Sequence, residues 1–144
     1  APDDIVLGAG VPVTAPVRTA LALGRQADRR DAVVALDALC HRHLVTVADV
    51  ERYTSRSDRR RGAGRLSERL AVVDKRAESP METRVRLLLH DAGVPLAVAQ
   101  FVVRDRAGHF VARVDLAYPA HRIAVEYEGD HHRSRPLDRA GSAG

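Results

Sequence analysis

Acidic side chains interrupt a stretch, residues 114–132, that otherwise has the pattern of buried β-strand. Within residues 123–128 apolar side chains alternate with others, so a strand here has one apolar face and one face that carries Glu126 and Glu128. Asp115 lies in the preceding apolar run, and the turn between the two runs is short enough to fold them antiparallel. We therefore expect these three carboxylates to lie close together in a half-buried sheet.

Carboxylates crowded in this way repel one another and cost desolvation energy. Either a cation then lies between them or some of them stay protonated. A hard divalent cation that prefers oxygen ligands, such as Mg²⁺, suits this set of side chains best. The sequence therefore predicts a magnesium site on the sheet.

The composition bounds the class of protein. The chain has 144 residues, enough for one ordinary domain or two small ones, and a formal net charge of +4 carried mostly by arginine. A positive net charge is compatible with nucleic-acid or other acidic partners. The single Cys40 allows no internal disulfide and no cysteine zinc site, which predicts a cytoplasmic protein. There is no signal peptide or membrane-length apolar run, and the start at Ala1 without Met predicts a fragment.

The first 76 residues have the pattern of a helical module. Two short extended pieces come first, and four helices are expected after them, at about residues 14–24, 30–44, 46–53 and 66–75. Thr14 and Thr46 are the expected N-caps of the first and third helices. The loop 55–64 is rich in arginine and is either a solvated loop or a phosphate-binding patch.

The second module begins at a clear helix start. Ser79 is the expected N-cap, with proline next and Glu82 at the third helical position, and the helix should end before Gly93. Strands are expected at 98–104, 109–118 and 123–128. The predicted fold class is therefore α+β, with domains at residues 1–76 (helical), 77–133 (one helix and a three-strand antiparallel meander) and 134–144 (a disordered tail).

Residues 79–132 resemble the PD-(D/E)XK, or restriction-endonuclease-like, superfamily, and in particular its branch related to very-short-patch-repair endonucleases. The residues that carry the resemblance are Glu82, Asp115, Glu126, Tyr127, Glu128, Gly129, His131 and His132. Residues 11–76 are similar to the segment that precedes this domain in long bacterial homologues. A winged-helix region related to abortive-infection antitoxins is often present there, and would lie before Ala1.

The resemblance implies an α/β nuclease fold and Mg²⁺-dependent hydrolysis of DNA phosphodiester bonds. Asp115 and Glu126 would be metal ligands, and Glu82 would bind or orient the metal through water. His131 or His132 would act as general acid or base. DNA is the implied partner.

The sequence departs from the superfamily pattern in two places. Glu128 stands where the superfamily usually has a lysine, and a carboxylate cannot stabilise developing negative charge. Relatives continue after the histidines with another helix and strand, whereas this chain continues as a tail from Ser134. We therefore expect a truncated α+β core, with an inactive nuclease as one alternative.

Each candidate site residue also has an ordinary structural interpretation. Glu82 could serve only as a helix-capping residue. Asp115 could pair with Arg113 or Arg122, Glu126 and Glu128 could lie on a solvated strand face, and the histidines could form a polar turn. Two other classes of function therefore stay open: a non-catalytic DNA-binding or antitoxin-like regulatory protein, and a helical protein-interaction module.

Overall fold

Helices and antiparallel sheets make up the chain, which confirms the predicted α+β class and the three-strand antiparallel meander. The computed structural model describes residues 4–56 and 62–128. Its elements are β1 (Ile5–Gly8), β2 (Val11–Thr14), α1 (Pro16–Gly24), α2 (Arg29–His41), α3 (Val47–Thr54), α4 (Ala63–Leu70), α5 (Pro80–Asp91), β3 (Val98–Arg104), β4 (Phe110–Tyr118), a 3-10 turn η3 (Pro119–His121) and β5 (Ile123–Val125). None of the described helices is long and apolar enough to cross a membrane.

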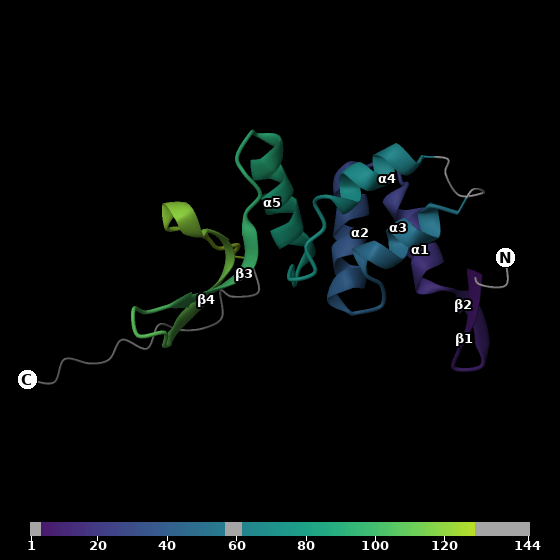
Figure 1. The fold of residues 1–144 in the computed structure, drawn as a ribbon, viewed down its shortest axis with the longest axis horizontal. Helices are drawn as coiled ribbons and strands as arrows, with labels where there is room; N and C mark the ends of the chain where they lie inside the picture. Colours follow the sequence, from purple (N-terminus) through teal and green to yellow (C-terminus); the bar gives the residue numbers. More distant parts are fainter. Residues whose placement is uncertain (1–3, 57–61, 129–144) are drawn as a thin grey trace, which may run out of the picture.

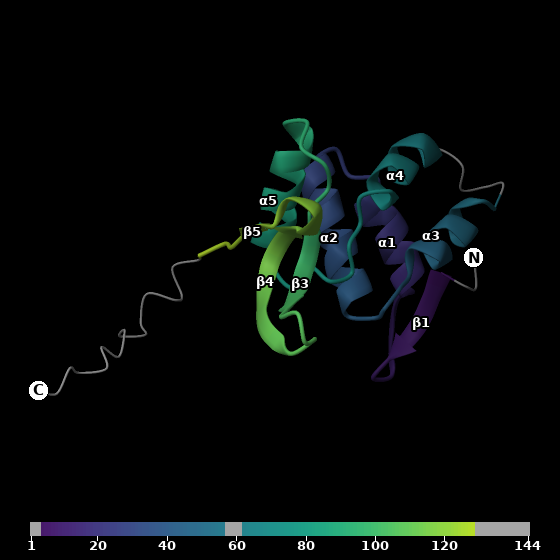
Figure 2. The same cartoon turned by 60° about the vertical axis from the view of Figure 1, so that its left-hand side comes forward.

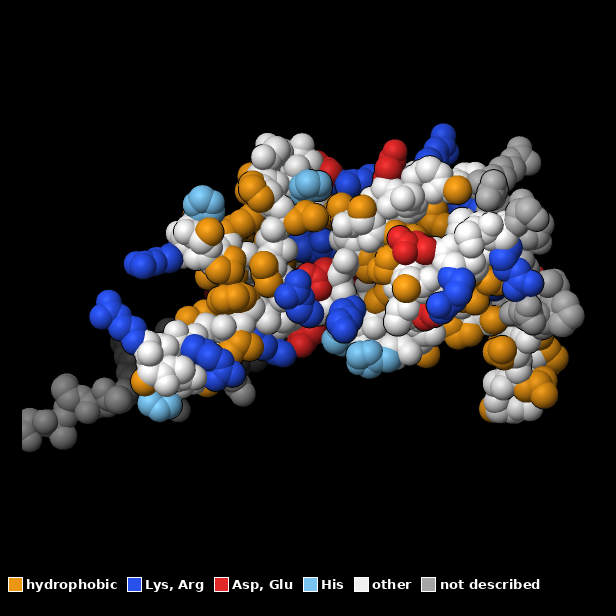
Figure 3. Space-filling model, viewed as in Figure 1, with side chains coloured by type: hydrophobic (Ala, Val, Ile, Leu, Met, Phe, Trp, Pro, Cys, Tyr) orange, Lys and Arg blue, Asp and Glu red, His pale blue; other side chains and the backbone are white. Residues whose placement is uncertain are grey.

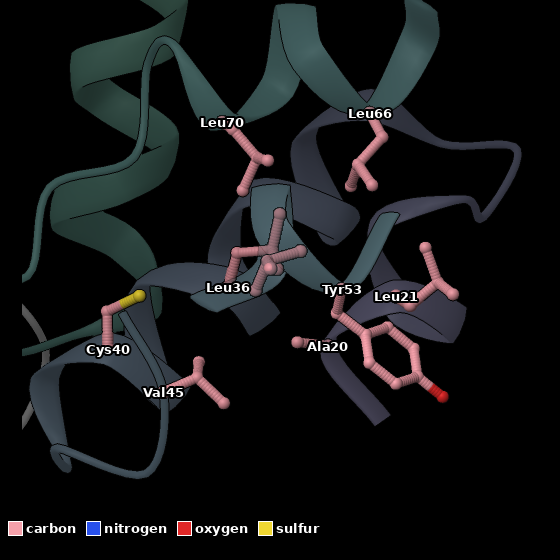
Figure 4. Packing of buried hydrophobic residues seen from close by; sticks show 9 residues of the cluster. Ala20, Leu21, Leu36, Cys40, Val45, Tyr53, Leu66 and Leu70 are labelled. Atoms are coloured by element: carbon pink, nitrogen blue, oxygen red, sulfur yellow. The ribbon is translucent and has the colours of Figure 1, made fainter. Parts of the chain in front are cut away.

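Helices α1 to α4 gather around one apolar core, as Figures 1 and 4 show. The buried side chains of this core are Ala20, Leu21, Leu36, Cys40, Val45, Val50, Tyr53, Leu66 and Leu70. Gly24 allows α1 to approach α4 closely, because a Cβ atom there would lie 2.4 Å from Cδ1 of Leu66. The core is aliphatic apart from Tyr53 and Cys40, in keeping with the low aromatic content of the sequence.

Local capping explains where most of these helices begin. Thr46 forms a capping box at the start of α3: its hydroxyl accepts the Asp49 N–H, and the Asp49 carboxylate accepts the Thr46 N–H at 3.0 Å. The predicted cap at Thr14 is wrong, because the N-cap of α1 is Ala15 and no side chain caps it. The Thr14 hydroxyl instead lies 2.8 Å from the hydroxyl of Thr19.

Two helices end earlier than their apolar periodicity predicts. The expected helix to residue 44 ends at His41, because His43 has a left-handed backbone (φ +56°) that cannot continue an α-helix. The expected helix to residue 75 ends at Leu70. Val73 still packs against the core, from the turn that follows the helix.

A buried ion pair joins α2 to α5. The guanidinium of Arg86 donates to Oδ2 of Asp37 at 2.7 Å, and both side chains are 2% exposed. Asp37 also accepts the Thr83 hydroxyl at 2.7 Å and the Asp74 N–H at 2.8 Å, while Arg86 donates to the Val72 carbonyl at 2.6 Å. The two buried charges are thus compensated by one another and by neutral hydrogen bonds.

The second sheet packs on α5 (Figures 1 and 2). Strands follow in the order β3-β4-β5, all antiparallel, and Val85 of α5 packs against a small core on the sheet, made of Ala97, Ala99 and Leu116. The helix begins as predicted, since the Ser79 hydroxyl accepts the Glu82 N–H at 3.2 Å. Strand β3 also has its predicted bounds, whereas β5 ends at Val125 instead of residue 128.

Candidate functional site

The predicted site lies where the start of α5 meets the sheet. Glu82, in the first turn of α5, is only 6% exposed although it carries a carboxyl group. Its Oε2 accepts the backbone N–H of Glu78 at 3.1 Å and the side-chain amide of Gln100 at 2.8 Å. Glu82 is therefore more than a cap, because one of its two contacts reaches from the helix to strand β3.

Asp115 and Glu126 face each other across β4 and β5. The register pairs Leu116 with Val125, which brings the residues on either side of that pair, Asp115 and Glu126, opposite each other. The Glu126 carboxylate accepts the Asp115 N–H at 3.3 Å, and the Asp115 carboxylate accepts the Tyr127 N–H at 3.0 Å. Two carboxylates of like charge thus lie at neighbouring positions of one sheet, an arrangement that is unfavourable unless something compensates it.

Gln100 links these two groups of contacts. It lies opposite Asp115, between the paired positions Ala99–Leu116 and Phe101–Val114. Its Nε2 is 2.8 Å from Oε2 of Glu82 and 3.5 Å from Oδ1 of Asp115. The Gln100 amide and the Asp115 backbone N–H therefore link the carboxylates of Glu82 in α5, Asp115 in β4 and Glu126 just after β5. We call this set the carboxylate–amide cluster (Glu82, Gln100, Asp115 and Glu126).

The backbone at Gln100 is itself unusual. Its φ is +50°, a left-handed value that non-glycine residues rarely adopt, and it occurs in the middle of a strand. Such conformations cost free energy and are concentrated at functional sites. The conformation places the amide of Gln100 between two carboxylates, which is what the cluster requires.

No arginine or lysine of the described ranges forms an ion pair with a carboxylate of the cluster. Arg113, one of the two arginines considered as partners of Asp115, donates instead to both carboxylate oxygens of Glu78, at 2.7 and 3.1 Å. The other, Arg122, has a left-handed backbone after the 3-10 turn and makes no ion pair within residues 4–56 and 62–128. Among the described residues, the negative charge of the cluster is thus relieved by N–H groups alone.

The remaining predicted site residues are not brought into the cluster. Glu128 is exposed and has no hydrogen bond or ion pair within the part of the chain that the structure describes. His131 and His132 lie outside the described residues, as do residues 57–61 of the arginine-rich loop. Among the residues that are described, no three acidic, histidine or cysteine side chains already converge as a set of metal ligands.

Reasoning from the sequence missed Gln100. Its type is not diagnostic, and the signal that points to it is its place opposite Asp115 once strands 98–104 and 109–118 are paired antiparallel. The contact to Glu82 could not be read from any spacing, because it depends on the left-handed backbone of Gln100 and on how α5 packs on the sheet.

The visible surface in Figure 3 carries basic side chains in several separate places, with no single continuous basic patch on that face. Apolar side chains are exposed at the β1–β2 hairpin, which projects from the end of the molecule farthest from the sheet (Figures 1 and 3). Ile5 and Leu7 of this hairpin are 60% and 75% exposed.

Fold and site together define an α+β protein with a carboxylate–amide cluster at a helix–sheet junction. The chain is similar to two curated proteins from two strains of Mycobacterium tuberculosis, both described as uncharacterized, with 35% identity over 125 residues. The match covers 87% of this chain and 46% of each relative, so the chain spans about half the length of the curated relatives it matches. No family model and no solved structure matches.

Proposed function

We propose that the chain is a Mg²⁺-dependent endonuclease-like protein that hydrolyses DNA phosphodiester bonds at the carboxylate–amide cluster. The observation that supports this most is that Glu82, Asp115 and Glu126 are linked through the Gln100 amide and the Asp115 backbone N–H, without any basic partner in the described ranges. Oxygen donors of this kind suit Mg²⁺, and binding of a cation would relieve the repulsion between them. A cytoplasmic location and DNA as partner belong to the same proposal.

The residues of the carboxylate–amide cluster have different proposed roles. Asp115 and Glu126 would hold the ion, and Glu82, which is buried and fixed by two donors, would orient a water molecule bound to it. A bound Mg²⁺ ion supplies electrostatic stabilisation of the phosphate charge and makes a bound water more acidic. Glu128 stands where a lysine is usual and cannot stabilise negative charge as a lysine would. We therefore assign the role of general acid or base to His132 or its neighbour His131.

A plasmid nicking assay tests this proposal. Asp115→Asn keeps the shape of the side chain but removes a charge, so we expect nicking with Mg²⁺ to fall by at least about 100-fold. Glu68→Gln, at an exposed position of α4, is the control and should nick like the wild type. Circular dichroism of both variants shows whether the fold is kept. Equal nicking by wild type and Asp115→Asn would remove the assignment.

The second candidate is a non-catalytic DNA-binding or antitoxin-like regulatory protein. It is favoured by the absence of three converging metal ligands among the described residues and by the formal net charge of +4. This candidate predicts no nicking with any divalent metal, together with duplex binding that weakens steeply as salt rises. Measuring both properties on one preparation separates the two functions.

A further inference from the structure

We propose that the chain binds a medium-length aliphatic carboxylate in a cavity between the α1–α4 core and the α5–sheet half. The cavity has a volume of about 800 Å³ and shares no residue with the carboxylate–amide cluster. It is enclosed by the end of α2 and the start of α3, by the connection from α4 to α5, and by the residues that lead into β3. The connection runs between α2 and α5 (Figure 1) and bonds both of them. The inference goes beyond the proposed function and does not depend on Mg²⁺.

The wall of this cavity is mainly aliphatic. Val45 and Val72 are buried in it, and Leu96, which is 38% exposed, lines it from the approach to β3. Among the described residues, no aromatic side chain lines the cavity, so it offers no platform on which a nucleobase or another flat ring could stack. An aliphatic chain needs no such platform, because it gains free energy simply by leaving water.

The charges at the cavity favour a ligand with an anionic end. Its basic side chains are Lys75, Arg76 and Arg86, whereas Asp74 is the one acidic residue that lines it within the described ranges. Arg76 pairs with Asp74 at 2.8 Å, and Arg86 pairs with Asp37 in the interior. Lys75 makes no ion pair within residues 4–56 and 62–128. A carboxylate in the cavity would therefore find a cation that is not already compensated.

The start of α3 adds hydrogen-bond donors to the same cavity. Val47 and Ala48 line it and occupy the first two positions of α3, whose N–H groups have no acceptor within the helix. Asp49 does not line the cavity, and its carboxylate is already bonded to Thr46 and Arg52. The partial positive charge of a helix start also favours an anion. Aliphatic wall, free cation and helix start together suit an alkyl chain that ends in a carboxylate.

A series of carboxylates tests the two parts of this site separately. Calorimetry with hexanoate, octanoate and decanoate should show binding that tightens about two- to fourfold for each added CH₂ group, because each one leaves water. Decylamine has the alkyl chain of a fatty acid but the opposite charge, so it should bind at least about tenfold more weakly than decanoate. Equal affinity for decanoate and decylamine, or no saturable binding of decanoate, would overturn the proposal.

NMR determines where decanoate binds. We expect the methyl signals of Val45, Val72 and Val98, which come from the three enclosing segments, to shift together and to reach saturation. The exposed side chains of Ile5 and Leu7 in the β1–β2 hairpin are the internal control, since an adventitious apolar contact would occur there. Shifts confined to the hairpin would show that decanoate does not use the cavity.

Substitutions complete the test. Lys75→Gln removes the free cation and should weaken decanoate binding about three- to tenfold without weakening decylamine binding. Arg106→Gln makes the same change in net charge at an exposed position between β3 and β4, and should bind decanoate like the wild type. Ala48→Phe fills the cavity from an exposed position of α3 and should abolish binding, with circular dichroism showing that the fold is kept. Equal weakening by Lys75→Gln and Arg106→Gln would mean that net charge alone matters, which overturns the site.

Discussion

At the scale of single residues, Asp37 offers a sharp comparison because α2 carries two aspartates that pair with arginines of α5. Asp37 pairs with Arg86 in the interior, whereas Asp31 pairs with Arg84 at 2.7 Å on the surface, with both side chains about half exposed. The two pairs join the same two helices and differ mainly in burial. Comparing them therefore separates the contribution of burial to the free energy of unfolding from the contribution of the charge pair alone.

We predict that Asp37→Ala lowers the free energy of unfolding by about 3–5 kcal/mol, because it leaves the buried Arg86 without its counter-charge. Asp31→Ala should cost no more than about 1 kcal/mol, since water screens an exposed pair. Urea denaturation of both variants measures the difference. A cost for Asp37→Ala as small as that for Asp31→Ala would contradict the buried ion pair.

Residue identity alone could predict part of the candidate site. Asp115 and Glu126 were predictable as neighbours, because an acidic residue within each of two apolar runs joined by a short turn leaves few other pairings. Glu82 was predictable as a first-turn residue of a helix, but its contact with the sheet depends on tertiary packing. Gln100 was not predictable, since neither its left-handed φ nor its two contacts follow from local sequence.

At the scale of elements, helix starts that are set by a capping side chain were easier to predict than helix ends. Capping residues act within one turn, so Thr46 and Ser79 correctly identify the starts of α3 and α5. Ends depend on more distant partners. Strand β5 ends at Val125 because the Asp115 N–H is taken by the side chain of Glu126 instead of by a further backbone carbonyl.

The capping box of α3 predicts a dependence of stability on pH. The hydroxyl and N–H of Thr46 lower the pKa of Asp49 below its usual value of 3.8. A carboxyl whose pKa is lower in the folded state stabilises the fold above the unfolded pKa, and this stabilisation is lost as pH falls through the folded pKa. Stability from Asp49 is thus fully present at neutral pH and disappears in acid.

We therefore expect Asp49→Asn to melt at a lower temperature than wild type at neutral pH, with the difference shrinking as the pH falls below about 4. Thermal melts followed by circular dichroism over a series of pH values give this difference directly. A gap between the two proteins that stays constant across the series would show that the cap does not depend on the charge of Asp49.

At the scale of the whole molecule, the link between α2 and α5 bears on how the chain unfolds. The sequence predicts a boundary between modules at residues 76–77, and the α1–α4 core and the α5–sheet core are distinct clusters. Yet Asp37 on one side bonds Thr83 and Arg86 on the other, so neither cluster can open without exposing a buried charge. Coupling of this strength favours one cooperative unit over two.

We predict that both halves unfold in a single transition, and the tyrosines of the chain allow each half to be followed. Tyr53 lies in the helical core, whereas Tyr118 and Tyr127 lie on the sheet side. Tyr53→Phe leaves tyrosine emission only on the sheet side, and the double variant Tyr118→Phe with Tyr127→Phe leaves it only in the helical core. In each variant, the urea midpoint from fluorescence should equal that from circular dichroism.

Asp37→Ala supplies the matched test of that coupling. Once the buried pair is removed, α5 stays joined to α2 by the small apolar cluster of Val33, Val72 and Leu87 and by exposed ion pairs. The α5–sheet half is then held less firmly, so the sheet-side tyrosines should report a lower urea midpoint than Tyr53 does. Asp31→Ala removes only an exposed tie between the same helices and should leave the two midpoints equal. Two separate transitions in the tyrosine variants that keep Asp37 would instead mean that residues 1–76 and 77–133 unfold independently, and that the ion pair does not couple them.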